Sequence, residues 1–208
     1  MVDNNKLQSL NTDFESTDEL EKQRAIISDA VRTILKAVGE DPNREGLLDT
    51  PMRVAKAYEE LLEGYSQDII DLVNGALFDV QYGSNEMILV EDIPYDSLCE
   101  HHMLPFSGRA HVAYIPSEKI IGLSKIPRIV EMYARRLQVQ ERLTNQIMET
   151  VDEVLSPEGV IVMLEGTHEC AALRGIKKKG MNMRTIATTG VFATDSDLKK
   201  EFLQLVRK

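Results

Sequence analysis

The period of the hydrophobic pattern changes about 80 residues into the chain, and this change limits the folds that the chain can adopt. Before that point, apolar residues recur every three or four positions, as on one face of an amphipathic helix. The first such stretch, 16–39, begins with the capping-box spacing of Ser16 and Glu19, and the second, 50–64, begins with a Thr-Pro pair whose threonine can cap a helix. Segment 109–115 instead alternates along its length, as a strand does.

The rest of the chain continues this mixture of periods. We expect further strands at 87–90, 160–164 and 185–192, and further helices after Ser124, after Gln140 and from about 197 to the end. This order predicts an α+β protein with an antiparallel sheet, helices on one face of it and a helical N-terminal segment. We expect a polar, flexible arm at 1–15 and a single domain at 16–208, divided into a helical segment, 16–80, and a sheet-containing core, 85–195.

Composition argues against several classes of partner. The net charge of −10 repels a phosphate backbone, and an aromatic content of 5% leaves little surface for base stacking, so we expect no nucleic-acid partner. No window approaches the ~18 uninterrupted apolar residues of a membrane span, and the N-terminus lacks the apolar core of a secretory signal. We therefore expect a cytoplasmic protein without a membrane partner, whose two cysteines bind metal rather than form a disulfide.

Thiols and imidazoles gather in two short segments, although the chain has only two cysteines and four histidines. Cys99, His101 and His102 lie within four residues, and His168 and Cys170 lie together further along the chain. Thiolate and imidazole are ligands that suit zinc. Cys99, His102 and Cys170 can form a three-ligand zinc site with a position open for water, which leaves His101 and His168 for proton transfer.

Three other interpretations compete with this catalytic site. A closed structural zinc site would use one of the remaining histidines as its fourth ligand. Two buried structural cysteines would need no metal. A zinc nucleobase deaminase is excluded because the chain lacks the H-x-E and P-C-x-x-C motifs.

Basic residues form local islands in this acidic chain. Ser124 and Lys125 lie at an expected helix N-terminus, which attracts anions, and Arg128 can share that turn. Arg174 is a further candidate because arginine binds phosphate oxygens in pairs. For Lys177–Lys179 we favour a solvated basic face. Together these residues predict a phosphate-binding site without a P-loop motif.

Gln140 and Glu141 bring an amide and an acid together at the start of an expected helix. A glutamate can accept two N–H groups from a guanine-type edge. On the residues alone, we favour an ordinary acid that is stabilised by the helix dipole.

Four motifs make the chain resemble the GTP cyclohydrolase I family over roughly residues 16–194. They are Ser97-Leu-Cys-Glu-His-His102, Ile121-Gly-Leu-Ser-Lys-Ile126, Gln138-Val-Gln-Glu-Arg-Leu-Thr144 and His168-Glu-Cys-Ala-Ala-Leu-Arg-Gly175. The resemblance implies the tunnelling fold, a four-stranded antiparallel sheet with two helices on one face. It also implies a homo-oligomer, a decamer of two stacked pentamers, with sites between subunits.

The resemblance further implies roles for individual residues. Zinc is expected on Cys99, His102 and Cys170, with His101 and His168 as the catalytic histidines. The expected contacts to the triphosphate of GTP come from Ser124, Lys125, Arg128 and Arg174. The expected contacts to guanine come from Gln140 and Glu141. The implied reaction is hydrolysis of GTP to formate and 7,8-dihydroneopterin triphosphate, the first step of pterin biosynthesis.

The chain departs from the family's pattern in two segments. Residues 171–173 are less polar than expected before an Arg-Gly pair, and residues 181–185 read Met-Asn-Met-Arg-Thr where relatives often carry Asn-Ser-Lys-Thr. Both departures concern the pocket wall and phosphate contacts rather than the expected zinc ligands and histidines. Two alternatives therefore remain: a relative that acts on another purine or pterin or stops at a different product, and a binding or regulatory protein built around structural zinc.

Overall fold

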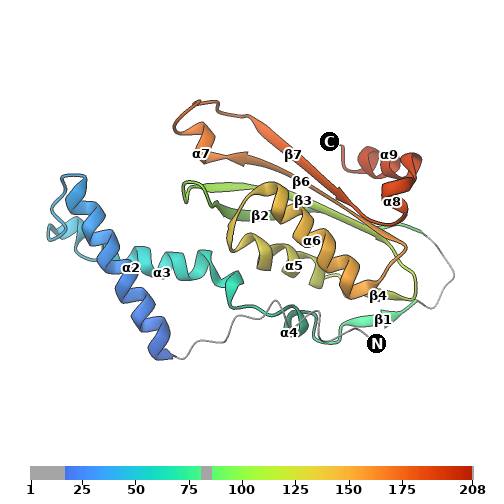
Figure 1. Ribbon diagram of the computed structural model, residues 1–208, viewed down its shortest axis with the longest axis horizontal. Coiled ribbons are helices and arrows are strands. Elements are labelled where there is room, and N and C mark those ends of the chain that lie inside the picture. The colour runs from blue at the N-terminus through green and yellow to red at the C-terminus, as the bar shows by residue number, and fades with distance from the viewer. Residues whose placement is uncertain (1–16, 81–85, 208) are drawn as a thin grey trace.

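The computed structural model describes residues 17–80 and 86–207, so the expected arm at 1–15 and the Ser16 cap lie outside the described residues. The helices are α2 (Thr17–Ala37), α3 (Thr50–Leu61), α4 (Ile69–Val73), α5 (Lys125–Ala134), α6 (Gln140–Leu155), α7 (Glu169–Ala172), α8 (Val191–Thr194) and α9 (Ser196–Leu205). The strands are β1 (Leu77–Asp79), β2 (Ile88–Cys99), β3 (Pro105–Ile115), β4 (Lys119–Ile121), β5 (Leu137–Gln138), β6 (Gly159–His168) and β7 (Asn182–Thr188). The α+β class is confirmed (Figure 1).

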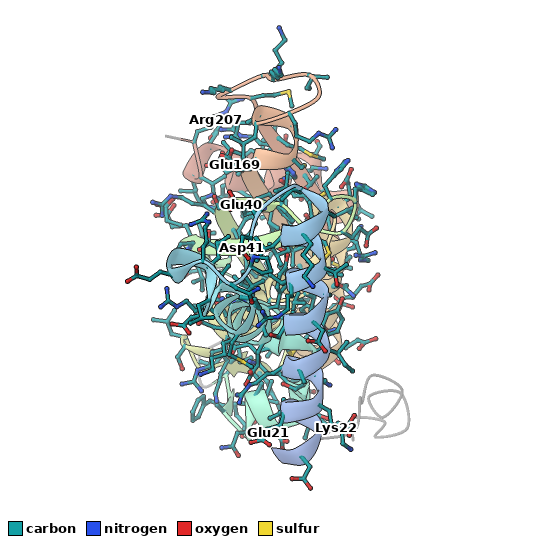
Figure 2. The ribbon with its side chains drawn as sticks, turned by 90° about the vertical axis from the view of Figure 1, so that its left-hand side faces the viewer. Glu21, Lys22, Glu40, Asp41, Glu169 and Arg207 are labelled. Carbon is teal, nitrogen blue, oxygen red and sulfur yellow. The ribbon has the colours of Figure 1, made fainter. Side chains whose placement is uncertain are left out.

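The two N-terminal helices, α2 and α3, pack against each other to one side of the sheet, as Figure 1 shows. Two hydrogen bonds of 2.5 and 2.7 Å join Arg24 to Glu59 across this pair. Figure 2 shows α2 from this end of the molecule, running from Glu21 and Lys22 toward Glu40. Val38, which follows α2 directly, is 70% exposed. Although α2 has 21 residues, neither it nor any other described helix is long and apolar enough to cross a membrane.

The main sheet has the strand order β5-β2-β3-β6-β7. The β2–β3, β3–β6 and β6–β7 pairs are antiparallel, which confirms the expected four-stranded antiparallel sheet. The two-residue strand β5 adds a parallel edge beside the end of β2. Separately, β1 and β4 form a small antiparallel ribbon. The candidate site is therefore built on a sheet whose main part is the four long strands β2, β3, β6 and β7.

All four predicted strands differ from the structure in their bounds: segments 109–115 and 160–164 lie within the longer strands β3 and β6, and the other two have identifiable causes. The expected strand at 185–192 is displaced, because β7 ends at Thr188 and residues 191–194 are helical. Gly190 explains this end, since its φ of +52° turns the chain and a Cβ there would lie 2.0 Å from the Glu158 carbonyl oxygen. The expected strand at 87–90 continues to Cys99 past a β-bulge at Asp92, whose φ is +58°.

Helices α5 and α6 cover one face of the sheet, as expected (Figure 1). Their apolar faces supply the centre of the main core, with Ile129, Leu143 and Ile147 fully buried against β-strand residues such as Val162. A second, smaller core lies on the opposite face, where α8 and α9 contribute Phe192 and Phe202. The candidate site lies at one end of the main core.

Gly108 of β3 pairs with Gly166 of β6, and we predict that Gly108→Ala destabilises the fold. A Cβ at this position would lie 1.8 Å from the Glu165 carbonyl oxygen, so one of the paired strands would have to shift. The expected loss is about 3 kcal/mol of unfolding free energy, measured by thermal denaturation of the assembled protein. Gly122→Ala is the matched control, because its Cβ would meet only ordinary contacts at 3.6 Å. Equal stability of both variants would contradict the prediction.

Candidate active site

The turn between β2 and β3 carries the first group of thiol and imidazole side chains. Cys99 ends β2 and is 5% exposed, and its N–H donates to the Leu104 carbonyl oxygen at 2.9 Å. The Met103 N–H donates back to the Cys99 carbonyl oxygen at 2.8 Å, with Met103 at a φ of +53°. His101 and His102 are exposed on this turn. The turn is thus closed by backbone hydrogen bonds while its two imidazoles face outward.

The second group lies beside the first because β6 pairs with β3. His168 ends β6 opposite Phe106, and α7 begins at the next residue and carries Cys170. The Cys170 thiol contacts the Cys99 thiol, and both cysteines are free of disulfides. Burial, together with the contact to Cys99, raises the pKa of Cys170, whereas the charge of Arg174 lowers it. The fold therefore brings together two thiols that are distant in sequence.

The thiols and imidazoles gathered here are of the types that bind zinc, although their side chains do not converge on one metal position. His101 Nδ1 lies 3.8 Å from Cys99 Sγ, whereas His102 makes a ring contact with His101 at 6.4 Å between centroids. Among residues 17–80 and 86–207, no three His, Cys, Asp or Glu side chains converge on one metal position. Two adjacent thiols with exposed imidazoles beside them are nevertheless ligands of the kind that zinc prefers.

His168 is held by contacts on two sides. Its ring stacks on Phe106, with 4.7 Å between centroids and 2° between planes. Its Nε2 lies 3.0 Å from Gln140 Oε1. Burial lowers the pKa of His168, and the nearby charge of Glu141 opposes this shift without cancelling it. A pKa below the ordinary value favours a neutral imidazole at pH 7, which is able to accept a proton.

A cavity of about 350 Å³ opens next to His168. It is lined by Thr167, His168, Glu169, Ala172, Leu173, Lys178, Lys179, Gly180 and Met181. Two of the three lysines that the sequence pattern assigned to a solvated face therefore line this cavity. Leu173 and Met181, which belong to the two segments that depart from the family's pattern, form part of its wall.

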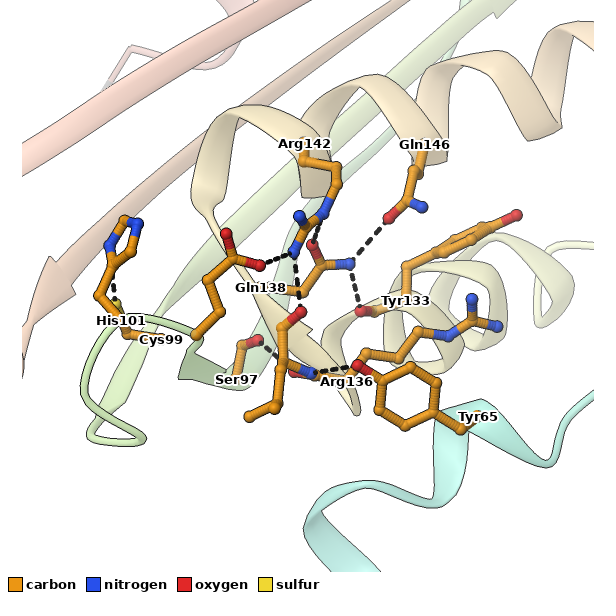
Figure 3. A network of polar contacts seen from close by, with 11 residues as sticks. Tyr65, Ser97, Cys99, His101, Tyr133, Arg136, Gln138, Arg142 and Gln146 are labelled. Carbon is orange, nitrogen blue, oxygen red and sulfur yellow. Dashed lines mark hydrogen bonds and ion pairs between the residues drawn. The ribbon is translucent and has the colours of Figure 1, made fainter.

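A network of polar contacts ties this site to helix α6 and was not expected from the sequence (Figure 3). Arg142 on α6 donates to Glu100, in the turn after Cys99, and also to Gln138 Oε1 at 3.0 Å. The Gln138 amide donates in turn to Gln146 Oε1 at 2.8 Å. No sequence signal indicates this pairing, because Glu100 is exposed and an exposed acid needs no cationic partner. This network fixes the position of the turn relative to α6.

The residues expected to bind the triphosphate lie in two separate places. Arg174 lies near Cys170, but Ser124, Lys125 and Arg128 lie around the start of α5, beside β1 and β4 (Figure 1). That end of α5 is remote from the β2–β3 turn in the same chain.

The start of α5 is also occupied by contacts of its own. Helix α5 begins after Ser124 as predicted, but the Ser124 side chain makes no capping hydrogen bond. Lys125 Nζ donates to the Leu72 carbonyl oxygen at 2.8 Å. Arg128 lines a second cavity, of about 490 Å³, together with the acidic side chains of Asp68, Asp71 and Glu131. A single chain therefore does not bring these three residues to His168.

Comparison with known proteins identifies the family. The profile of GTP cyclohydrolase I matches residues 27–207. This chain belongs to the GTP cyclohydrolase I family. GTP cyclohydrolase 1 of Gloeobacter violaceus is 56% identical over 178 residues, which cover 86% of this chain and 82% of the relative. GTP cyclohydrolase 1 of Chlorobaculum tepidum is 54% identical over 192 residues, which cover 92% of this chain and 85% of the relative.

The chain is also similar to a third relative and, weakly, to a solved structure. GTP cyclohydrolase 1 of Leptospira biflexa is 55% identical over 177 residues, which cover 85% of this chain and 96% of the relative. Among solved structures, the apo form of the archaeosine synthase QueF-Like aligns with 51% of this chain and 96% of its own at 20% identity, with a TM-score of 0.44. This low likeness adds nothing to the assignment to the GTP cyclohydrolase I family, which rests on the family profile and the relatives.

Proposed function

We propose that this chain carries out the GTP cyclohydrolase I reaction with zinc held by Cys99, His102 and Cys170, and with His101 and His168 as its proton-transfer residues. The activity of the family is the conversion of GTP to dihydroneopterin triphosphate. One observation supports the residue assignment above all others: the thiols of Cys99 and Cys170 meet beside His101 and close to His168. Because both thiols are free, we place the reaction in the reducing cytoplasm.

The three proposed ligands divide between two elements. Cys99 and His102 come from the β2–β3 turn, and Cys170 comes from α7. Zinc bound there would lower the pKa of its water to about 7 and so supply a hydroxide near neutral pH. The thiols must lose their protons to bind the metal, and the positive charge of Arg174 favours that loss at Cys170. His102 is exposed on its turn, so its ring is free of core packing that would oppose rotation toward the thiols.

The proposed proton transfers accompany hydrolysis of the purine's five-membered ring. Addition of a first water at C8 and cleavage of one C–N bond open the ring to a formamide, and a second water hydrolyses this formamide to formate and a free amine. Each cleavage requires a proton to move onto the departing nitrogen. His168 lines the cavity beside the thiols and has a lowered pKa, which suits a group that accepts and returns a proton near pH 7. His101, within 3.8 Å of the Cys99 sulfur, is placed to assist.

The charges around the cavity suit a nucleotide substrate. Lys178 and Lys179 line the cavity and Arg174 lies near Cys170, so local positive charge is available for a triphosphate in an otherwise acidic chain. Glu141 is exposed in the first turn of α6 and close enough to His168 to affect its pKa. We assign Glu141 to the guanine edge, whose N–H groups a carboxylate can accept.

The remaining triphosphate contacts would come from a neighbouring copy of the chain. Ser124, Lys125 and Arg128 are remote from His168 within one chain, so they reach a substrate at this cavity only across an interface. Exposed apolar side chains on α2 and directly after it, Ile26, Ile34 and Val38, are consistent with burial in an assembly. We therefore propose a homo-oligomer, and the family resemblance favours a decamer of two pentamers.

Removal of zinc is expected to abolish formate release from GTP. The purified protein should contain about one zinc per chain, and extraction with a chelator should lower formate release by at least about 100-fold, with recovery when zinc is returned. Metal content is measured by atomic emission and formate by a coupled dehydrogenase assay. Zinc content without formate release would instead support a binding protein built around structural zinc. Formate release from another purine but not from GTP would support the alternative substrate.

A further inference from the structure

We propose that Gln140 is a positioning residue that fixes the hydrogen of His168 on Nε2, so that Nδ1 is the nitrogen that exchanges protons with the substrate. The inference rests on the proposed role of His168 in proton transfer. It also changes the role that the family resemblance implied for Gln140, which was a contact to guanine.

The orientation of the Gln140 amide follows from its surroundings. Gln140 is fully buried, and its Nε2 lies 3.2 Å from the Leu164 carbonyl oxygen and 3.0 Å from the Met183 carbonyl oxygen. Carbonyl oxygens only accept hydrogen bonds, so the atom facing them must be the NH₂ group. The other amide atom is therefore the oxygen, and it is this oxygen that faces His168.

The tautomer of His168 follows from the same contact. Gln140 Oε1 can only accept a hydrogen bond, and it lies 3.0 Å from His168 Nε2. His168 Nε2 must therefore carry a hydrogen in order to donate it. In the neutral imidazole the other nitrogen, Nδ1, then holds the lone pair and is the atom able to accept a proton.

Two threonines stabilise this amide orientation. Thr185 Oγ1 lies 3.1 Å from Gln140 Nε2 and 2.6 Å from Thr144 Oγ1. The Thr144 hydroxyl donates to the backbone carbonyl oxygen of Gln140 at 2.7 Å. Thr185 can therefore accept from the amide and donate to Thr144, which closes a circuit of hydrogen bonds at the start of α6. A flipped amide would break this circuit and would set its oxygen against two carbonyl oxygens.

The ring of His168 is restrained in both of its rotations. Stacking on Phe106, which is 1% exposed, sets the plane of the ring, and the hydrogen bond to Gln140 sets the rotation within that plane. Gly166 leaves room for this arrangement, because a Cβ there would lie 2.6 Å from the Tyr95 hydroxyl and 3.0 Å from Gln140 Oε1. With its polar side-chain atoms committed to protein groups, Gln140 has no group to offer a purine edge, whereas Glu141 next to it is exposed.

The test combines kinetics with nuclear magnetic resonance of the zinc-loaded enzyme. Gln140→Met keeps an unbranched side chain of similar length but removes both the NH₂ and the oxygen. We expect kcat for formate release to fall by about 10- to 100-fold, as for other groups that orient a functional histidine, and KM for GTP to stay within about twofold. Thr185→Val is the matched control, because it disturbs the same buried circuit while the contact between Gln140 and His168 remains. Because the Leu164 and Met183 carbonyl oxygens still hold the NH₂ group, kcat should fall by no more than about threefold, well short of the loss in Gln140→Met.

Resonance measurements report the tautomer directly. The chain has four histidines, so ¹³C,¹⁵N-histidine labelling gives few signals, and the one absent from His168→Gln identifies His168. We expect the Nε2–H tautomer in the wild type and a mixture in Gln140→Met. This measurement on the wild type needs no folded variant at position 140 and no turnover, so it separates failure of this inference from failure of the proposed activity.

Three results would overturn the inference. The Nδ1–H tautomer in the wild type would exclude it directly. A rise in KM for GTP with unchanged kcat in Gln140→Met would return Gln140 to the guanine contact. An equal fall of kcat in Thr185→Val and Gln140→Met would mean that the circuit acts only through the stability of this region.

Discussion

Replacing His168 with alanine is expected to lower formate release from GTP by at least about 100-fold while zinc stays bound. General acid–base catalysis by one residue typically contributes about 10²- to 10⁴-fold, and His168 is the imidazole that lines the cavity next to the two thiols. The variant removes that imidazole but leaves Cys99, His102 and Cys170 in place. Formate release and zinc content are measured on the same purified sample, so that the two effects are separated.

Cys170→Ser provides the contrasting variant for this experiment. It removes a proposed ligand, so zinc content and formate release should fall together. If His168→Ala also loses zinc, His168 is a fourth ligand and the site is the closed structural one. If His168→Ala keeps more than about a tenth of wild-type activity, proton transfer must be assigned to another group, with His101 the first candidate.

Two inactive variants are expected to restore activity when they assemble together. Arg128→Gln removes a proposed phosphate contact and should lose about 10- to 100-fold in kcat/KM, while His168→Ala should lose more. In mixed oligomers, some sites pair an intact Arg128 from one chain with an intact His168 from another. Random assembly of equal amounts gives about a quarter of such sites, and so about a quarter of wild-type activity. We expect this recovery because the start of α5, which carries Arg128, is remote from the β2–β3 turn within a single chain, so that the two residues at one site come from different chains (Figure 1).

Co-expression with two affinity tags isolates the mixed oligomers for this test. The control is a mixture of the two separately purified variants, measured before subunits exchange, which should show only the sum of their low activities. Mixed oligomers that are no more active than this sum would place Arg128 and His168 in the same chain's site, or would remove Arg128 from the phosphate contacts.

Local periodicity predicts those elements whose burial pattern is regular. The alternation of segment 109–115 belongs to β3, which is buried on both faces near its end, and the helical spacing after Gln140 belongs to α6. Strand β2 was predicted too short because the bulge at Asp92 and the proline at position 94 interrupt its alternation. Those two residues carry turn-like signals although the strand continues through them, held by its pairing with β3.

The candidate site was predictable where residue type alone indicates chemistry. Thiols and imidazoles are rare in this chain, so the amino-acid sequence is enough to propose Cys99 and Cys170 as partners. Contacts between ordinary polar residues leave no such signal. The contact of Gln140 with His168, and that of Arg142 with Glu100, depend on how α6 lies across the sheet, which no local pattern encodes.

The first turn of α6 has a consequence for how this enzyme can change. Gln140 contacts His168, the proposed proton-transfer residue, and Arg142 contacts Glu100 in the turn of the proposed zinc ligands, so one helix end acts as a common bracket for both halves of the site. A substitution that tilts α6 would displace both halves together and could not adjust one alone. Variants with altered substrate preference should therefore accumulate in the wall of the cavity, at positions such as Leu173 and Met181, while the bracket stays constant.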